Sequence, residues 1–482
     1  MAPVHPTIAM VPCPGLSHLI PQLEFAKRLV RLHPEFHVKL LIPTLGSPSA
    51  TTQSLLKHLP SQIHYHFLPQ INAQDLPPNV NPATQMHLTV KHSLPYISHE
   101  LTSLHSQSTL VALLVDLFSV DALEFGKKLN VHSHVLYASS AANLSFLLYL
   151  PTLHEILTNN NGDLSKPVKL PGSSIAIPAR DLPDMIHARG SPYYATMLHL
   201  CEGLHKADSI AINTFQDLEP EAMKTFPEIN SDLPAFPVGP IIQTPAKTRA
   251  TGPGTECLEW LDNQPRDSVL YVCFGSGATL SYEQTAELAL GLEMSGQRFI
   301  WVVRPPSGSS ISTYLSAQKD KNDPFVFLPE GFVDRTKDRG FLIQSWCPQI
   351  DVLRHESTGG FLTHCGWSST LESLVYGKPT IVWPLFADQP INAVMLANEL
   401  KVAVRPVADE KEGIIKREEV ARCVKCVLES NEGKEMYKRV LKVKDAAAIA
   451  LGEKGSSTEN LATMALKWKN SKAFSLMDVD VQ

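Results

Sequence analysis

Short apolar runs alternate with amphipathic stretches along the first half of the chain. Residues 7–12 form an apolar run with β-branched members, and residues 20–32 then repeat apolar positions at helical spacing. The alternation then continues. Further apolar runs lie at residues 38–42, 111–115 and 131–137, and a helical stretch at 120–129 separates the last two runs. Strands that alternate with helices predict a parallel sheet covered on both faces.

A change of composition near residue 240 separates this series from a second one. Residues 243–255 are polar, rich in proline and glycine and without periodicity, which predicts a linker. The second series has strands expected at 268–274, 299–303, 359–363 and 380–383, and helices at 281–295, 369–376, 417–428 and 436–468. The chain therefore contains two α/β halves of similar size. Ligands of such sheets bind beyond the carboxyl ends of the strands, and a cleft between two such domains is the expected site.

Length and composition narrow the class of protein. The 482 residues predict two to four domains, and 44% hydrophobic with 19% charged residues is an ordinary globular balance. A net charge of −6 without a long basic run argues against a nucleic-acid partner. The apolar runs are too short to span a bilayer, the N-terminus does not resemble a signal peptide, and eight cysteines lie scattered. We expect a cytoplasmic protein without membrane insertion.

The segment from Trp346 to Gln389 is the most informative. Its middle is a predicted strand, residues 359–363, followed by His364-Cys365-Gly366-Trp367 and a helix that opens at Ser368 or Ser369. Free backbone N–H groups, hydroxyls and an imidazole at a helix N-terminus suit a phosphate. The alternative is a capping box, with Ser369 as N-cap and Glu372 three residues later. Spacing alone does not choose between them.

The same segment resembles the 44-residue donor-binding signature of plant family 1 UDP-glycosyltransferases, without insertion or gap. The resemblance extends over the whole chain and is strongest to the branch that glucosylates hydroquinone, other simple phenols, monolignols and flavonoids. It implies a GT-B fold of two facing Rossmann-like, doubly wound domains. An acceptor-binding domain is expected at residues 1–240, and a linker follows at 241–256. A UDP-sugar-binding domain is expected at 257–461. A C-terminal helix and tail, residues 462–482, would return to the first domain.

The resemblance also assigns roles within the signature. Trp346 would stack on uracil, the backbone of Cys347 would bind the uracil edge, and Gln349 and Glu372 would hold the ribose hydroxyls. His364, Ser368 and Ser369 would bind the diphosphate. Trp367, Asp388 and Gln389 would contact the sugar, and a glutamine at the last position is associated with glucose.

Two positions depart from the family's usual pattern, and Ser276 adds a further expected phosphate contact. Residue 368 is Ser where the family most often has Asn, and residue 360 is Gly where Cys is common. Ser276 lies in the glycine turn of residues 274–279, where glycines let backbone approach a phosphate and the hydroxyl can donate to it. That turn also resembles the start of a dinucleotide fingerprint, although Leu280 stands where the third glycine belongs.

A second group is expected at the other sheet. His18 follows the first predicted strand and Asp116 follows the run 111–115, so both can meet at the carboxyl edge of one sheet. A lone histidine is usually structural, but the resemblance places the family's general base at His18 and its partner carboxylate at Asp116. An imidazole near pKa 6.5 can accept a phenolic proton, and a carboxylate can fix its tautomer.

Together these observations predict an inverting O-glucosyltransferase that moves glucose from UDP-glucose to a small phenolic acceptor and yields a β-glucoside. We expect no cofactor, no metal in the reaction and a monomer. One alternative is a sensor that binds UDP-sugar without turnover. The other is an NAD(P)-dependent oxidoreductase, for which Glu293 comes near the spacing of a ribose-binding carboxylate.

Overall fold

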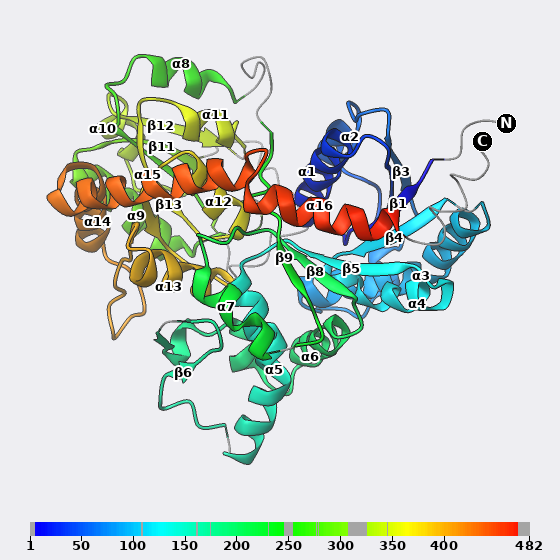
Figure 1. Cartoon of the computed structure of the whole chain (residues 1–482). Helices are drawn as coiled ribbons and strands as arrows, with labels where there is room; N and C mark the ends of the chain where they lie inside the picture. Colours follow the sequence, from blue (N-terminus) through cyan, green and yellow to red (C-terminus); the bar gives the residue numbers. More distant parts are fainter. Residues whose placement is uncertain are drawn as a thin grey trace. The chain divides into compact units, whose positions relative to one another are not determined.

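The computed structural model describes the chain from His5 to Asn470, except for residues 108, 161, 174, 230, 245–253, 276, 278, 307–324 and 345. It divides into two compact units (Figure 1). Unit 1 contains residues 1–179, 185–243 and 449–482, and unit 2 contains residues 180–184 and 244–448. The sequence placed the corresponding boundaries at 240, 256 and 461.

In unit 1 the described residues form one parallel sheet with the strand order β3-β2-β1-β4-β5-β8-β9. Its strands are β1 Thr7–Val11, β2 His37–Ile42, β3 Ile63–Phe67, β4 Leu110–Val115, β5 His132–Tyr137, β8 Ser209–Ile212 and β9 Ala235–Pro237. A small antiparallel pair, β6 Val168–Lys169 and β7 Ala176–Ile177, lies apart from it. The parallel sheet predicted from the alternating pattern is confirmed in this unit.

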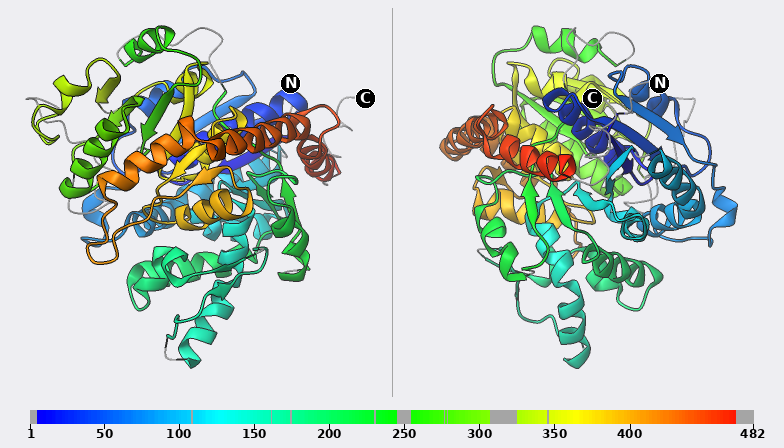
Figure 2. Two further views of the ribbon diagram at one scale, coloured as in Figure 1. Left: turned by 90° about the vertical axis from the view of Figure 1, so that its left-hand side faces the viewer. Right: turned by 45° about the vertical axis from the view of Figure 1, so that its right-hand side comes forward.

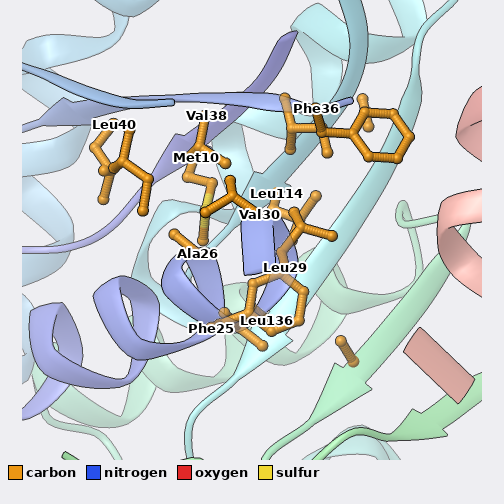
Figure 3. Close-up of a cluster of buried hydrophobic side chains, with 14 of the residues drawn as sticks. Met10, Phe25, Ala26, Leu29, Val30, Phe36, Val38, Leu40, Leu114 and Leu136 are labelled. Carbon is orange, nitrogen blue, oxygen red and sulfur yellow. The ribbon is translucent and has the colours of Figure 1, made fainter. Parts of the chain in front are cut away.

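Helices cover both faces of this sheet. They are α1 Leu16–Leu32, α2 Ala50–Leu56, α3 Pro82–Ser106, α4 Leu123–Leu129, α5 Ala141–Asn159, α6 Pro192–Leu204, α7 Pro220–Ile229 and α16 Ser456–Lys469, with short turns η1 Ala73–Asp75, η2 Leu117–Ala122, η3 Ala179–Asp181 and η4 Asp184–Ala188. Figures 1 and 2 show α1 and α3 on opposite sides of the sheet. The buried face of α1, including Phe25 and Leu29, points toward Met10 and Val38 of the strands (Figure 3).

The C-terminal helix α16 is part of this core. Leu461, Met464 and Trp468 are buried in the same cluster as α1, and the indole N–H of Trp468 donates to Nε2 of His134 at 2.8 Å. Burial lowers the pKa of His134 to about 3, so the ring stays neutral and keeps its acceptor lone pair. The single helical stretch expected at 436–468 is wrong: α15 Asn431–Leu451 ends before Gly452, and α16 begins after Gly455.

In unit 2 the described residues form a second parallel sheet with the order β12-β11-β10-β13-β14-β15. Its strands are β10 Val269–Cys273, β11 Arg298–Val303, β12 Gly340–Gln344, β13 Thr358–Thr363, β14 Thr380–Val382 and β15 Ala403–Val404. Its helices are α8 Glu256–Asp262, α9 Tyr282–Ser295, α10 Phe332–Thr336, α11 Gln349–Arg354, α12 Trp367–Val375, α13 Gln389–Val394, η5 Met395–Glu399, α14 Arg417–Glu429 and α15.

The alternation of side chains along β10 explains the two helical layers of unit 2. Leu270 and Val272 pack in one buried cluster with α9 and α14, whereas Val269 and Tyr271 pack in another with α8 and α11. A strand that is apolar on both faces needs helices on both, as the sequence pattern predicted.

Each sheet has one point at which its strand order reverses, and this point positions the candidate site. In unit 1 the reversal lies between β1 and β4, and in unit 2 between β10 and β13. Connections leave such neighbouring strands in opposite directions and open a crevice at their carboxyl ends. None of the described helices is long and apolar enough to cross a bilayer.

Candidate functional site

The reversal point of unit 1 brings His18 and Asp116 together. Val11 and Val115 end neighbouring parallel strands in register, and the N–H of Asp116 donates to the carbonyl of Val11 at 3.0 Å. Helix α1 begins at Leu16 after Gly15, whose φ of 119° suits glycine. His18 therefore lies in the first turn of α1, whereas the sequence pattern began this helix only at residue 20.

The two side chains form a hydrogen-bonded pair. Nδ1 of His18 lies 2.9 Å from Oδ2 of Asp116, and the N–H of Phe118 donates to Oδ1 at 3.0 Å. The Asp116 side chain is 1% exposed and the His18 side chain 21% exposed. Burial alone would raise the pKa of Asp116, but the His18 ring and the two hydrogen bonds outweigh it and lower that pKa. The carboxylate is thus ionised at neutral pH, and an Nδ1–H tautomer leaves Nε2 of His18 as a proton acceptor.

Two neighbours of this pair were not predicted. The Phe118 ring meets the His18 ring edge-on, with centroids 5.3 Å apart, and so limits how that imidazole can turn. The Cys13 thiol is buried beside Asp116, and burial first, then the charge of Asp116, raises its pKa well above the ordinary value. The sequence signal was available, because Cys13 and Phe118 flank the same two strand ends.

The reversal point of unit 2 carries the middle of the segment from Trp346 to Gln389. Strand β13 ends at Thr363, Cys365 has a φ of 66°, and α12 begins at Trp367 with Gly366 as its N-cap. The proposed capping box is wrong, because Ser369 lies inside the helix and is not its N-cap. The N-cap Gly366 has no side chain that could cap the first turn, and this helix end follows the turn at Cys365, a geometry that suits an anion.

His364 is held between two glycines next to that helix end. A Cβ at Gly275 would come within 2.6 Å of the imidazole, and a Cβ at Gly366 within 2.5 Å, so neither position has room for a larger residue. Burial lowers the pKa of His364 to about 4, so in the free protein a neutral ring is available to donate one N–H. Ser276, predicted to face the same phosphates, lies outside the described residues.

The two predicted ribose ligands contact each other directly. Nε2 of Gln349 donates to Oε2 of Glu372 at 2.6 Å and to Oγ of Ser369 at 3.1 Å. The hydroxyl of Tyr271, a residue that the sequence did not suggest, donates to Oε1 of Gln349 at 3.1 Å. Burial raises the pKa of Glu372 to about 7, and the hydrogen bond from Gln349 opposes this shift. Tyr271 and Gln349 thus orient a carboxyl that titrates near neutrality.

Exposure distinguishes the aromatic residues of the signature. Trp346 is 57% exposed, which suits a residue on whose ring a base can stack. Cys347 and Trp367 are buried, at 3% and 4% exposed, so their side chains do not offer an open face as Trp346 does. Ser368 is half-buried and Ser369 is buried at the N-terminal turn of α12.

The end of the signature is braced by an asparagine that was not predicted. Nδ2 of Asn392 donates to Oδ2 of Asp388 at 3.0 Å and to the carbonyl of Cys365 at 3.0 Å. Oε1 of Gln389 accepts from the N–H groups of Leu385 and Phe386 at 2.8 and 3.1 Å. The amide N–H₂ of Gln389 is therefore the end that can meet a sugar hydroxyl. The available sequence signal was the spacing alone, because Asn392 stands four positions after Asp388, about one helical turn.

The dinucleotide alternative does not fit unit 2. Glu293, its candidate ribose ligand, lies near the C-terminus of α9 and not at a strand end. Its carboxylate accepts from Nε and Nη2 of Arg335 at 2.7 and 3.1 Å. An NAD(P)-binding carboxylate would be expected at the end of the second strand of the fold, which here is β11.

Comparisons with known proteins agree with this geometry. Residues 238–445 match the family model described as UDP-glucoronosyl and UDP-glucosyl transferase. The hydroquinone glucosyltransferase of Rauvolfia serpentina is 45% identical over 96% of this chain and 98% of its own. Phytolacca americana UGT2, solved with UDP-2fluoro-glucose and pterostilbene, is 44% identical with a TM-score of 0.87, over 96% of this chain and 100% of its own. A Polygonum tinctorium UDP-glucosyltransferase capable of glucosylating indoxyl, solved with 3,4-dichloroaniline, is 41% identical with a TM-score of 0.88, over 98% and 100% of the chains.

Proposed function

Since this chain belongs to the UDP-glycosyltransferase family, we propose that it transfers glucose from UDP-glucose to the hydroxyl of a small phenol, with inversion and without a metal. Its fold is the GT-B fold expected from the sequence. The relatives' names support glucose as the sugar and phenols as the acceptor class. The observation that carries the proposed chemistry is the 2.9 Å contact of His18 with the buried carboxylate of Asp116.

That contact suits a general base. A phenol has a pKa of about 10, and it becomes a strong nucleophile only when its proton can leave as attack develops. In our proposal Nε2 of His18 takes that proton, and Asp116 stabilises the resulting imidazolium through Nδ1–H. The phenolic oxygen forms its bond to C1 of glucose while the bond from C1 to the diphosphate oxygen breaks. A single displacement of this kind inverts C1 and gives a β-glucoside.

Unit 2 supplies the donor contacts in this proposal. Trp346 stacks on uracil, the Cys347 backbone binds its edge, and Gln349 and Glu372 hold the ribose. The departing diphosphate gains negative charge, which the N–H groups of α12 and the N–H of His364 stabilise. Ser368, Ser369 and Ser276 add hydroxyl donors, and Asp388, Gln389 and the Trp367 backbone contact the glucose.

The test is to incubate the purified protein with UDP-glucose and EDTA and with hydroquinone, coniferyl alcohol, a flavonol, an isoflavone or an aliphatic alcohol. We expect hexosylated phenols by mass spectrometry and a β anomer by NMR. Intact UDP-glucose with every phenol would contradict the proposal. Activity that EDTA abolishes and Mg²⁺ restores would contradict its metal-independent part, and an α-glucoside would contradict inversion.

A further inference from the structure

A second cluster of chemistry-bearing side chains lies in unit 1, apart from the His18–Asp116 pair. His87 of α3, Asp121 of η2 and His199 of α6 each offer one ligand atom, and these atoms lie within 4.8 Å of one another. Nε2 of His199 is 2.8 Å from Oδ1 of Asp121, and Nε2 of His87 is 3.8 Å from Oδ2. Three separate elements thus aim two imidazoles at the same carboxylate.

An ordinary surface ion pair does not account for this arrangement. It would need only His199, which is 46% exposed, and Asp121. The almost fully buried His87 ring lies 3.8 Å from the same carboxylate and also faces the backbone of Phe118, and the two imidazole centroids are only 5.3 Å apart. If both rings were protonated, two cations would share one carboxylate, which is unfavourable. Two neutral imidazoles and one carboxylate are instead a common ligand set for Zn²⁺ and related ions.

The three ligand atoms lie within 4.8 Å of one another, so some of them must draw together by up to about 1.4 Å to bind such an ion. With metal–nitrogen and metal–oxygen bonds of about 2.0–2.2 Å, neighbouring ligand atoms of a tetrahedral site lie roughly 3.4 Å apart. Nε2 of His87 and Oδ2 of Asp121 are already near this value, and His199 must retreat slightly from Oδ1. His199 is half-exposed and can turn, whereas buried His87 supplies a fixed ligand. Solvent reaches the site from the His199 side and can complete the coordination.

We propose that His87, Asp121 and His199 bind one divalent transition-metal ion of the Zn²⁺ type. The ion would join α3, η2 and α6, which already contact one another and share a hydrogen bond between Thr84 and Thr196 at 3.3 Å. Helix η2 begins directly after Asp116 and contains Phe118. The metal would therefore steady the segment that holds the His18–Asp116 pair without taking part in glucosyl transfer. Activity in EDTA tests the proposed function and Co²⁺ binding tests this site, so either result can fail without the other.

Cobalt binding tests the site without measuring activity. Co²⁺ is titrated into the full-length protein while its visible absorption is recorded, and Zn²⁺ is then added as a competitor. We expect one equivalent with a nitrogen–oxygen spectrum that lacks a thiolate charge-transfer band, displaced by Zn²⁺. His199→Ala and Asp121→Asn should each weaken binding at least tenfold. His99→Ala, which removes an exposed histidine of the same helix α3, should bind as the parent does.

The competing group and the folding of the variants need their own controls. Cys13, His18 and Asp116 also lie within 4.8 Å of one another, and His18→Ala removes that alternative ligand set. Binding that His18→Ala abolishes, or that His199→Ala and Asp121→Asn leave unchanged, would overturn the proposal, as would a parent protein that binds no Co²⁺. The expected rise in Tm with Zn²⁺ should disappear in His199→Ala, which should fold as the parent does because position 199 is exposed.

Discussion

At the scale of single residues, burial decides which groups of the site are charged. Asp116 stays ionised although it is buried, because His18 and the N–H of Phe118 hold its carboxylate. Glu372 is buried with only an amide as its hydrogen-bond partner among the described contacts, so its pKa rises to about 7. The sequence could predict the residue types but not these charges, because burial follows from how strands and helices pack.

The titration of Glu372 gives a prediction for ligand binding. An ionised carboxylate accepts hydrogen bonds from both ribose hydroxyls better than a protonated one. Uridine, which has no phosphate to titrate, should therefore bind several-fold more tightly as the pH rises from about 6 to about 8. Calorimetry should show this trend in the parent and a flat profile in Glu372→Gln. A parent whose uridine affinity does not change over this range would contradict it.

The same shift fixes the sign of a stability effect. The carboxyl of Glu372 has a folded-state pKa above its ordinary value, so the folded protein holds that proton more tightly than the unfolded chain does. This contribution to stability is therefore present at low pH and is lost as the pH rises toward about 7. Glu372→Gln should remove that part of the pH dependence of the unfolding free energy.

At the scale of elements, periodicity placed each predicted strand, and the helices at 281–295 and 417–428, to within one residue, but it missed other helix boundaries. The predicted strands 111–115 and 359–363 differ from β4 and β13 by one residue at their start. Helix α12 begins at Trp367, one or two residues before the predicted start at Ser368 or Ser369. Its N-cap is Gly366, and a glycine has no side chain that could mark the cap in the sequence. The break between α15 and α16 was missed although the sequence signals it, because residues 452–460 contain two glycines and no hydrophobic residue.

The loop before α13 depends on a distant segment that periodicity could not reveal. Residues 180–184 belong to unit 2, and Oδ1 of Asp184 accepts from the N–H of Ala387 at 3.0 Å. Ala387 has a φ of 57°, a conformation that a residue with a side chain adopts only when its surroundings hold it. Arg405 donates to Oδ1 of Asp181 at 2.6 Å and anchors the same segment.

This anchor predicts a selective effect on the sugar. Loss of one hydrogen bond is typically about 0.5–1.5 kcal/mol, so Asp184→Ala should raise the KM for UDP-glucose by roughly 2–10-fold. The Kd for UDP should not change, because Asp388 and Gln389 are expected to contact the glucose alone. Asp184→Asn keeps an acceptor oxygen and should behave more like the parent. Equal losses of affinity for UDP and for UDP-glucose would contradict the role of Asp184 in holding the loop before α13 against the glucose.

At the scale of the whole molecule, both parallel sheets have one reversal of strand order, but they carry different functional residues there. Each places its chemistry at the point where its strand order reverses, between β1 and β4 in unit 1 and between β10 and β13 in unit 2. The alternating pattern and the linker predicted both sheets, and the parallel register brought His18 and Asp116 to neighbouring strand ends. The grouping of His87, Asp121 and His199 was beyond the sequence, because only the packing of three helices joins them.

The central claim is that unit 1 supplies the base and unit 2 holds the donor. The direct test measures kcat with a phenol and the Kd for UDP on the same preparations of His18→Ala, Trp346→Ala and the surface control His99→Ala. We expect His18→Ala to lose about 10²–10⁴-fold in kcat with an unchanged Kd, and Trp346→Ala to lose UDP affinity. Parent-like turnover in His18→Ala, with UDP still bound, would contradict the account.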